Sequence, residues 1–133
     1  MDKGQALYNF WSKFGLPAYD ENTVPDNAPE RYITYNTTFD SIGNVVNLYG
    51  NIWDINSNSW EFVSKKAEEI ARAIDEQYPI SYAIDNGRLY IAKGTPFAQR
   101  MSDPTGSRTA AGTNVDDVRR MYINIQAEFL TAF

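Results

Sequence analysis

Hydrophobic and polar residues alternate strictly along Arg119 to Phe129. One side of this stretch carries Met121, Ile123, Ile125, Ala127 and Phe129. The residues between them are polar or aromatic. A period of two places alternate side chains on opposite faces of a strand, so this segment is predicted to be a half-buried antiparallel strand.

Four further stretches rich in β-branched and aromatic residues predict strands, at Tyr32–Phe39, Val45–Ile55, Ile80–Asp85 and Arg88–Lys93. The turn residues of 40–44 join the first two strands into an antiparallel hairpin. Asn86-Gly87 joins the last two, because Asn-Gly suits the positive φ angles of a type I′ turn. In Val45–Ile55 both faces are partly apolar, so we expect this strand to be central in the sheet or covered on its second side.

A period near 3.6 predicts two helices. In Asp2–Phe14, four apolar residues lie on one face: Leu7, Phe10, Trp11 and Phe14. Gly15 follows as a helix stop. The second helix is expected to start at Asn58, which resembles the first residue of a capping box with Glu61 three residues later. It is expected to run to about Tyr78, just before Pro79. Its apolar stripe is Trp60, Val63, Ala67, Ile70, Ala71 and Ile74.

Two stretches predict irregular structure. The segment 15–31 contains three prolines and four acids: Asp20, Glu21, Asp26 and Glu30. It is either a solvated loop or an extended arm on a neighbouring subunit. The segment 94–114 is rich in small residues. Because long loops in compact domains are often functional, we hypothesise that it becomes ordered on contact with a partner.

These elements follow one another as α-β-β-α-β-β-loop-β. The sequence therefore predicts one α+β domain over 1–133, with a mixed, mainly antiparallel sheet of about five strands and two helices packed on one face.

Cysteine and histidine are both absent among the 133 residues. Their absence excludes thiol nucleophiles, imidazole triads and zinc sites built on these side chains. The remaining candidates are carboxylates. Asp54 and Asp85 lie near strand ends, where a general acid or base could lie. Asp116-Asp117 is either a pair of metal ligands or part of a turn or cap. Neither arrangement supplies a complete site, so no enzymatic activity, metal or cofactor is expected.

The formal net charge of −5 argues against nucleic-acid binding through phosphate neutralisation. No apolar run is long enough to span a membrane, and the N-terminus does not resemble a secretion signal, so synthesis in a cytoplasm is expected. The aromatic cluster of Phe10, Trp11 and Phe14 suits either the core or a partner site. Arg119 and Arg120, with Arg100 and Arg108, either contact an acidic surface or serve solubility.

The chain resembles the tail terminator (tail-completion) proteins of long-tailed bacteriophages. The resemblance rests on the order of segments: ALYNFWSKFG, LPAYDENTVPDNAPERYITY, a hairpin ending in NLYGNIWDI, a long helix, the Asn-Gly hairpin and RRMYINIQAEF. It implies a non-enzymatic α+β virion protein that forms a hexameric ring. Such a ring contacts the major tail tube protein and the head connector or neck protein, at the head–tail interface of the virion.

Charge distribution is consistent with a ring. The acids of 15–31 and the bases Arg88, Lys93, Arg100 and Arg108 are separated along the chain. Opposite charges on separate surfaces suit a head-to-tail contact, which closes into a ring when the rotation allows. Two other interpretations stay open: a head-closure or neck connector protein, and a small acidic inhibitor or immunity module.

Overall fold

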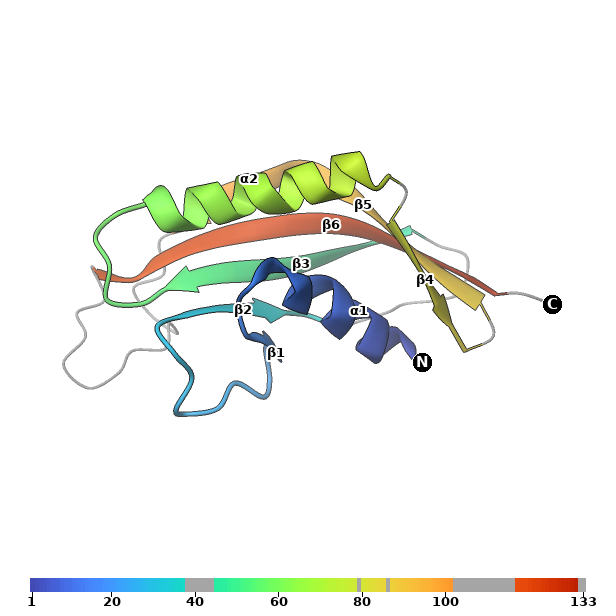
Figure 1. The fold of residues 1–133 in the computed structure, drawn as a ribbon, viewed down its shortest axis with the longest axis horizontal. Helices are drawn as coiled ribbons and strands as arrows, with labels where there is room; N and C mark the ends of the chain where they lie inside the picture. Colours follow the sequence, from blue (N-terminus) through green and yellow to red (C-terminus); the bar gives the residue numbers. More distant parts are fainter. Residues whose placement is uncertain (38–44, 79, 86, 102–116, 132–133) are drawn as a thin grey trace.

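A computed structural model describes residues 1–37, 45–78, 80–85, 87–101 and 117–131. Over these ranges the fold consists of two α-helices, one 3₁₀ turn and six strands (Figure 1). In chain order they are α1 (Lys3–Trp11), η1 (Ser12–Phe14), β1 (Ala18–Asp20), β2 (Arg31–Tyr35), β3 (Val45–Asp54), α2 (Glu61–Glu76), β4 (Ile80–Ile84), β5 (Gly87–Met101) and β6 (Arg119–Thr131).

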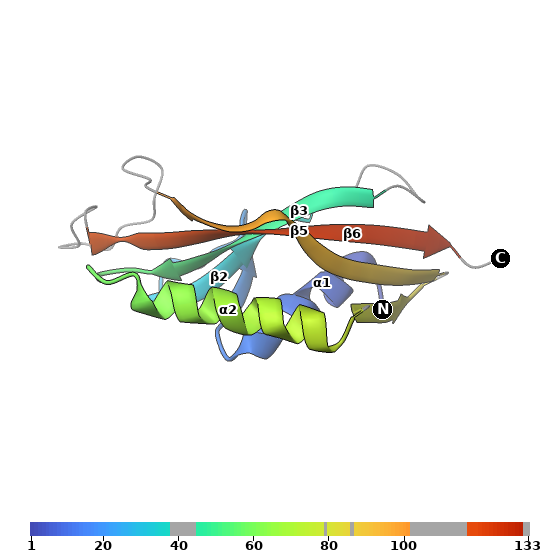
Figure 2. The same ribbon diagram turned by 90° about the horizontal axis from the view of Figure 1, so that it is seen from above.

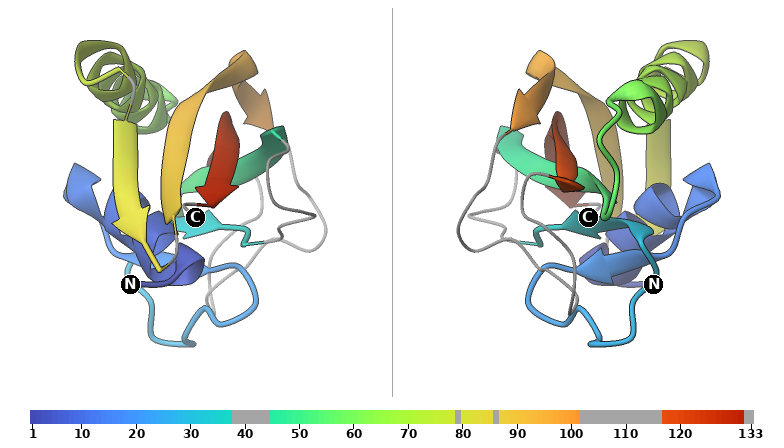
Figure 3. Two further views of the ribbon diagram at one scale, coloured as in Figure 1. Left: turned by 90° about the vertical axis from the view of Figure 1, so that its right-hand side faces the viewer. Right: turned by 90° about the vertical axis from the view of Figure 1, so that its left-hand side faces the viewer.

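All six strands belong to one mixed sheet in the order β1-β2-β3-β6-β5-β4. β1 and β2 are parallel, and every other neighbouring pair is antiparallel. The sheet curls strongly when it is viewed end-on (Figure 3). The predicted α+β class and mainly antiparallel sheet are confirmed, with one strand more than the roughly five expected.

Both helices lie on the same side of the sheet (Figure 2). The main hydrophobic core joins α1, α2 and all six strands. On β6 the structure confirms the predicted alternation, since every residue from Met121 to Phe129 at odd positions is buried. On α2 the buried positions are Val63, Ala67, Ile70 and Ile74, all from the predicted stripe.

A smaller apolar cluster lies on the other side of the sheet. Its buried members are Tyr32, Trp53 and Ile55. Val24 and Ala28, from the acidic segment, pack against it. The prediction for β3 is confirmed: the strand is central in the sheet, and its Trp53 end is covered on the second side by the loop that follows β1.

Two predicted irregular stretches prove partly regular. Residues 18–20 form β1, which pairs in parallel with β2, and Ile33 N–H donates to the Pro17 carbonyl at 2.9 Å. Residues 94–101 continue β5 through a bulge between Lys93 and Ala98. A bulge absorbs residues that do not fit the ladder, which is why Gly94 and Pro96 are tolerated there. Residues 102–114 of the predicted loop lie outside the described residues.

Several predicted boundaries also differ from the structure, and the strand predicted over Tyr32–Phe39 is Arg31–Tyr35. α2 begins at Glu61, and the Ser59 hydroxyl accepts from the Glu61 N–H, so Asn58 is not the cap. α2 ends at Glu76 instead of about Tyr78. The Asn-Gly hairpin is present, but Gly87 already pairs with Ile84, so the connection starts one residue earlier than predicted.

Candidate functional site

The sheet surface opposite the helices forms the candidate site. We call its central strip the open face, because none of the described helices covers it. It consists of outward-facing residues from three adjacent strands, none of them fully buried. They are Val45, Asn47 and Tyr49 on β3, Tyr122, Asn124, Gln126 and Glu128 on β6, and Arg88, Tyr90 and Ala92 on β5.

Composition separates this open face from the outer surface of α2. Every exposed residue of α2 is charged: Glu61, Lys65, Glu68, Glu69, Arg72, Asp75 and Glu76. On this side of the three strands only Arg88, Arg120 and Glu128 carry a charge, and tyrosine, asparagine and glutamine dominate the open face. Charged residues are depleted, and tyrosine enriched, in the centres of protein interfaces. The open face therefore has an interface composition, whereas the outer surface of α2 is suited to solvent.

Tyr49 links the open face to the acidic segment. Its hydroxyl donates to the Glu21 carboxylate at 2.8–2.9 Å, and its ring stacks on Tyr122 with centroids 5.4 Å apart. Burial, followed by the hydrogen bond to Glu21 and the negative charge of Glu21, raises the pKa of Tyr49 to about 12.

A hollow of about 470 Å³ adjoins this pair. Trp53 forms part of its lining and donates its indole N–H to the Thr34 hydroxyl at 2.9 Å. The Arg120 guanidinium lies 5.4 Å from the Trp53 ring and donates to the Asn51 side-chain oxygen at 3.2 Å. These contacts hold aromatic and polar groups in fixed positions, which reduces the entropy lost when a partner binds.

The raised pKa of Tyr49 predicts a loss of stability in alkali. Above about pH 10 the unfolded chain loses the tyrosine proton, whereas the folded protein keeps it until about pH 12. The free energy of unfolding should therefore fall between these values. Tyr49→Phe should flatten that fall, as measured by urea denaturation across this pH range.

Glu21→Gln tests the part of this shift that comes from Glu21, since it removes the charge that adds to the effect of burial on the pKa of Tyr49. The Tyr49 titration, followed by the NMR signals of its ring, should move to lower pH. Glu30→Gln, in the same segment, should leave it in place. An unchanged Tyr49 titration in Glu21→Gln would contradict the assignment.

The four predicted acidic contact residues occupy different environments. The Asp20 carboxylate accepts from the Asn22 N–H at 2.9 Å and the Thr37 hydroxyl at 3.1 Å, so it shapes the turn after β1. Glu21 lines the hollow beside Tyr49. Asp26 and Glu30 are exposed. The structure thus joins only Glu21 to the open face.

The predicted basic contact residues are spread over both sides of the sheet. Arg88 and Arg120 lie on the open-face side, with Arg88 donating to Ser81 at 2.9 Å. Lys93 lies on the helix side, 2.9 Å from the Asp75 carboxylate. Arg100 and Arg119 flank the Trp60 ring at 5.1 and 5.4 Å. Arg108 lies outside the described residues.

The carboxylates considered for catalysis have structural partners. Asp54 is buried and accepts from Arg31 Nε at 3.2 Å. Asp85 is exposed and contacts the Met1 amino group at 3.1 Å. The Asp117 carbonyl accepts from the Ser57 N–H, and Asp116 lies outside the described residues. Within the described ranges, no three acidic side chains gather as metal ligands would.

The aromatic cluster of the first helix belongs to the core. Phe10 and Trp11 are fully buried and Phe14 is nearly so. Of the two sequence interpretations, core or partner site, the structure supports the core.

The tyrosines Tyr49, Tyr90 and Tyr122 were not singled out from the sequence as site residues. The sequence does contain one indication of a contact surface, because the outward face of β6 has few charges. Which residues of β3 and β5 lie beside that face depends on the order and register of the strands, and the sequence pattern does not supply these.

Comparison with known proteins identified no relative: no family model, no curated protein and no solved structure matches this chain. In the part of the chain that the structure describes, no helix has the length and apolar character needed to cross a membrane.

Proposed function

We propose that this chain is a structural subunit of a long-tailed bacteriophage, assembling as a hexameric ring that closes the end of the tail tube. Its partners are further copies of itself, the major tail tube protein and the head connector or neck protein. Its place is the head–tail interface of the virion, after assembly in the host cytoplasm. It performs this role by contact, with no catalysis and no cofactor.

The observation that carries this proposal is the contrast between the two outer surfaces. The open face presents tyrosines and amides, with three charges on its side of the sheet (Arg88, Arg120 and Glu128), and the exposed residues of α2 are all charged. One surface has the composition of a protein interface, and the other has the composition of a solvent-exposed surface. This contrast suits a subunit that, in an assembly, contacts partners with one side and faces solvent with the other. The resemblance in the order of segments to tail terminators supplies the phage setting.

A few charged residues suit the rim of the open face. Arg88 and Arg120 lie on its side of the sheet, and Glu21 accepts from Tyr49 at its border. Rim charges contribute more to association rate and orientation than to affinity. In a head-to-tail ring, acids of one subunit would face bases of the next.

Electron microscopy tests the proposal. The purified chain is imaged alone and after mixing with tail tubes that lack it. Six-fold rings at one end of each tube, with none along the tube, are expected. Rings on the head vertex would favour the neck connector instead. A stable one-to-one complex with a basic protein, and no rings, would favour the inhibitor or immunity module.

A further inference from the structure

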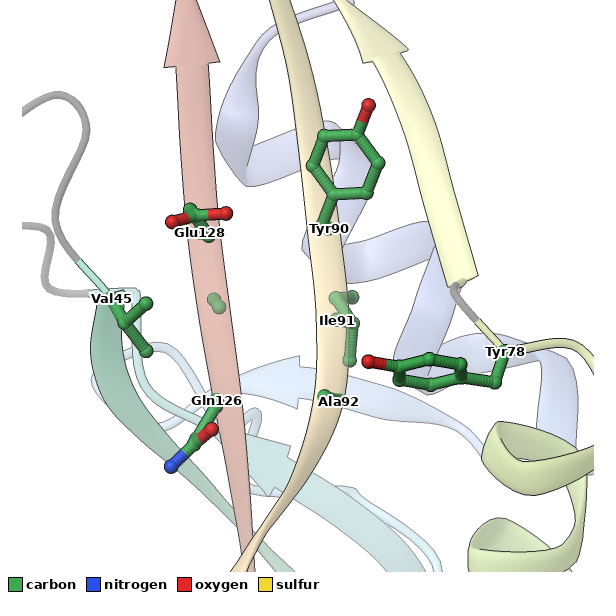
Figure 4. A pocket seen from close by; sticks show the side chains of 8 residues that line it. Val45, Tyr78, Tyr90, Ile91, Ala92, Gln126 and Glu128 are labelled. Atoms are coloured by element: carbon green, nitrogen blue, oxygen red, sulfur yellow. The ribbon is translucent and has the colours of Figure 1, made fainter.

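A second, smaller hollow lies on the open face around Glu128. Its volume is about 260 Å³, and Val45, Tyr78, Tyr90, Ala92, Gln126 and Glu128 line it together with Ile91 and Ala127. Figure 4 shows Glu128 and Gln126 projecting from β6, Tyr90 from β5, and Tyr78 reaching toward β5 from the end of α2. This volume is below the usual range for small-molecule sites, so it suits a single side chain.

Sheet register explains the shape of this hollow. Glu128 pairs with Val45 on one side and Tyr90 on the other. Two residues along β6, Gln126 pairs with Ala92, whose methyl group leaves room beside the larger neighbours. The walls are therefore aromatic and aliphatic, and polar acceptors stand between them.

Among the described residues that line the hollow, Glu128 is the only charged one. Its carboxylate has no hydrogen bond or ion pair within the described residues, whereas other acids near the sheet, such as Asp54 and Asp75, are paired. The site thus carries a negative charge between Val45 and Tyr90, and this charge has no partner among the described residues. Carboxylates and aromatic faces both attract lysine and arginine.

Tyr78 adds a second observation. It is 69% exposed, the most exposed of the large hydrophobic residues described, and it contributes to neither core cluster. Tyrosine is enriched among the residues that contribute most to binding when a partner buries it in an interface.

We propose that this hollow binds a lysine or arginine side chain presented by the partner protein, with the Glu128 carboxylate as acceptor and Tyr78 and Tyr90 as walls. The inference rests on the proposed function, because it names the chemistry of the partner that the open face contacts. An arginine fits best, since its planar group can stack on tyrosine while it donates to the carboxylate.

The test is an NMR titration of the full chain with the peptide acetyl-Gly-Arg-Gly-amide. Its matched probe replaces arginine with citrulline, which has nearly the same shape and no charge. Saturable shifts at Tyr78, Tyr90, Gln126 and Glu128 are expected with the arginine peptide only, weakening as salt is raised. Glu128→Gln should reduce the affinity about tenfold, and Glu68→Gln, on the exposed side of α2, should leave it unchanged.

Equal shifts with the citrulline peptide, or undiminished binding in Glu128→Gln, would overturn the inference. So would binding of neither peptide. The peptide comparison uses the wild-type chain and does not depend on how the variant folds.

Ring formation is measured separately, by electron microscopy. Rings without arginine binding would overturn this inference alone. Arginine binding without rings would overturn the proposed function.

Discussion

Replacing Trp11 with alanine is expected to lower the free energy of unfolding by about 3–5 kcal/mol, as for other fully buried aromatic residues. Trp11 is completely buried. Its ring lies 4.9 Å from Phe10 and stacks on Tyr35 at 6.4 Å. On a fold of this size, that loss is a large part of the total stability.

Gly50 explains why the loss should be so large. A Cβ atom at position 50 would lie 2.6 Å from Trp11 Cη2, so the indole occupies the space that any other residue would fill. The sheet closes on the helix because β3 has no side chain there. Alanine at position 11 leaves this space empty, and neighbouring strands held by ladder hydrogen bonds cannot collapse into it.

Urea denaturation measures this effect. Tyr8→Ala serves as the control, because Tyr8 is on the same helix and 44% exposed, and its loss should cost about 0.5 kcal/mol or less. Gly50→Ala should destabilise the wild-type protein and less so the Trp11→Leu protein, since the clash is then relieved. A Trp11→Ala protein within about 1 kcal/mol of wild type would contradict this packing.

Tyr122→Glu is expected to weaken assembly at least about thirtyfold while leaving the fold intact. Tyr122 lies on the open face beside the larger hollow, partly exposed and stacked on Tyr49. Loss of a tyrosine that an interface buries as a hot spot commonly costs 2 kcal/mol or more, equivalent to about thirtyfold in affinity. The introduced carboxylate would also be desolvated in the interface without a partner.

The matched control is Gln77→Glu, which adds the same charge at an exposed position just beyond α2. Sedimentation velocity over a range of protein concentrations gives the association constants, and circular dichroism verifies the fold. Weakening in both variants to the same degree would point to net charge instead of the open face.

Much of the fold could be predicted from local patterns. The alternation of β6, the stripe of α2 and the Asn-Gly hairpin each depend on residues close in sequence. β1 could not be predicted, because a three-residue strand between prolines acquires its hydrogen bonds from a distant strand, β2. The extension of β5 past Gly94 is similar, since its ladder partner is β6.

The candidate site was harder to predict than the fold. Charged residues stand out in the sequence as candidate contact residues. The structure, however, divides the basic ones between both sides of the sheet. Lys93 pairs with Asp75 and is directed away from the open face. Tyr49, Tyr90 and Tyr122 come from three separate segments, and only the register of β3, β6 and β5 brings them onto one surface.

The central claim is that the open face is the contact surface of a tube-closing ring. Electron microscopy of tail tubes incubated with wild type, Tyr122→Glu and Gln77→Glu in parallel tests it most directly. Wild type and Gln77→Glu should form six-fold rings at the tube end, and Tyr122→Glu should leave the ends bare. Tube ends capped equally well by Tyr122→Glu would contradict the claim.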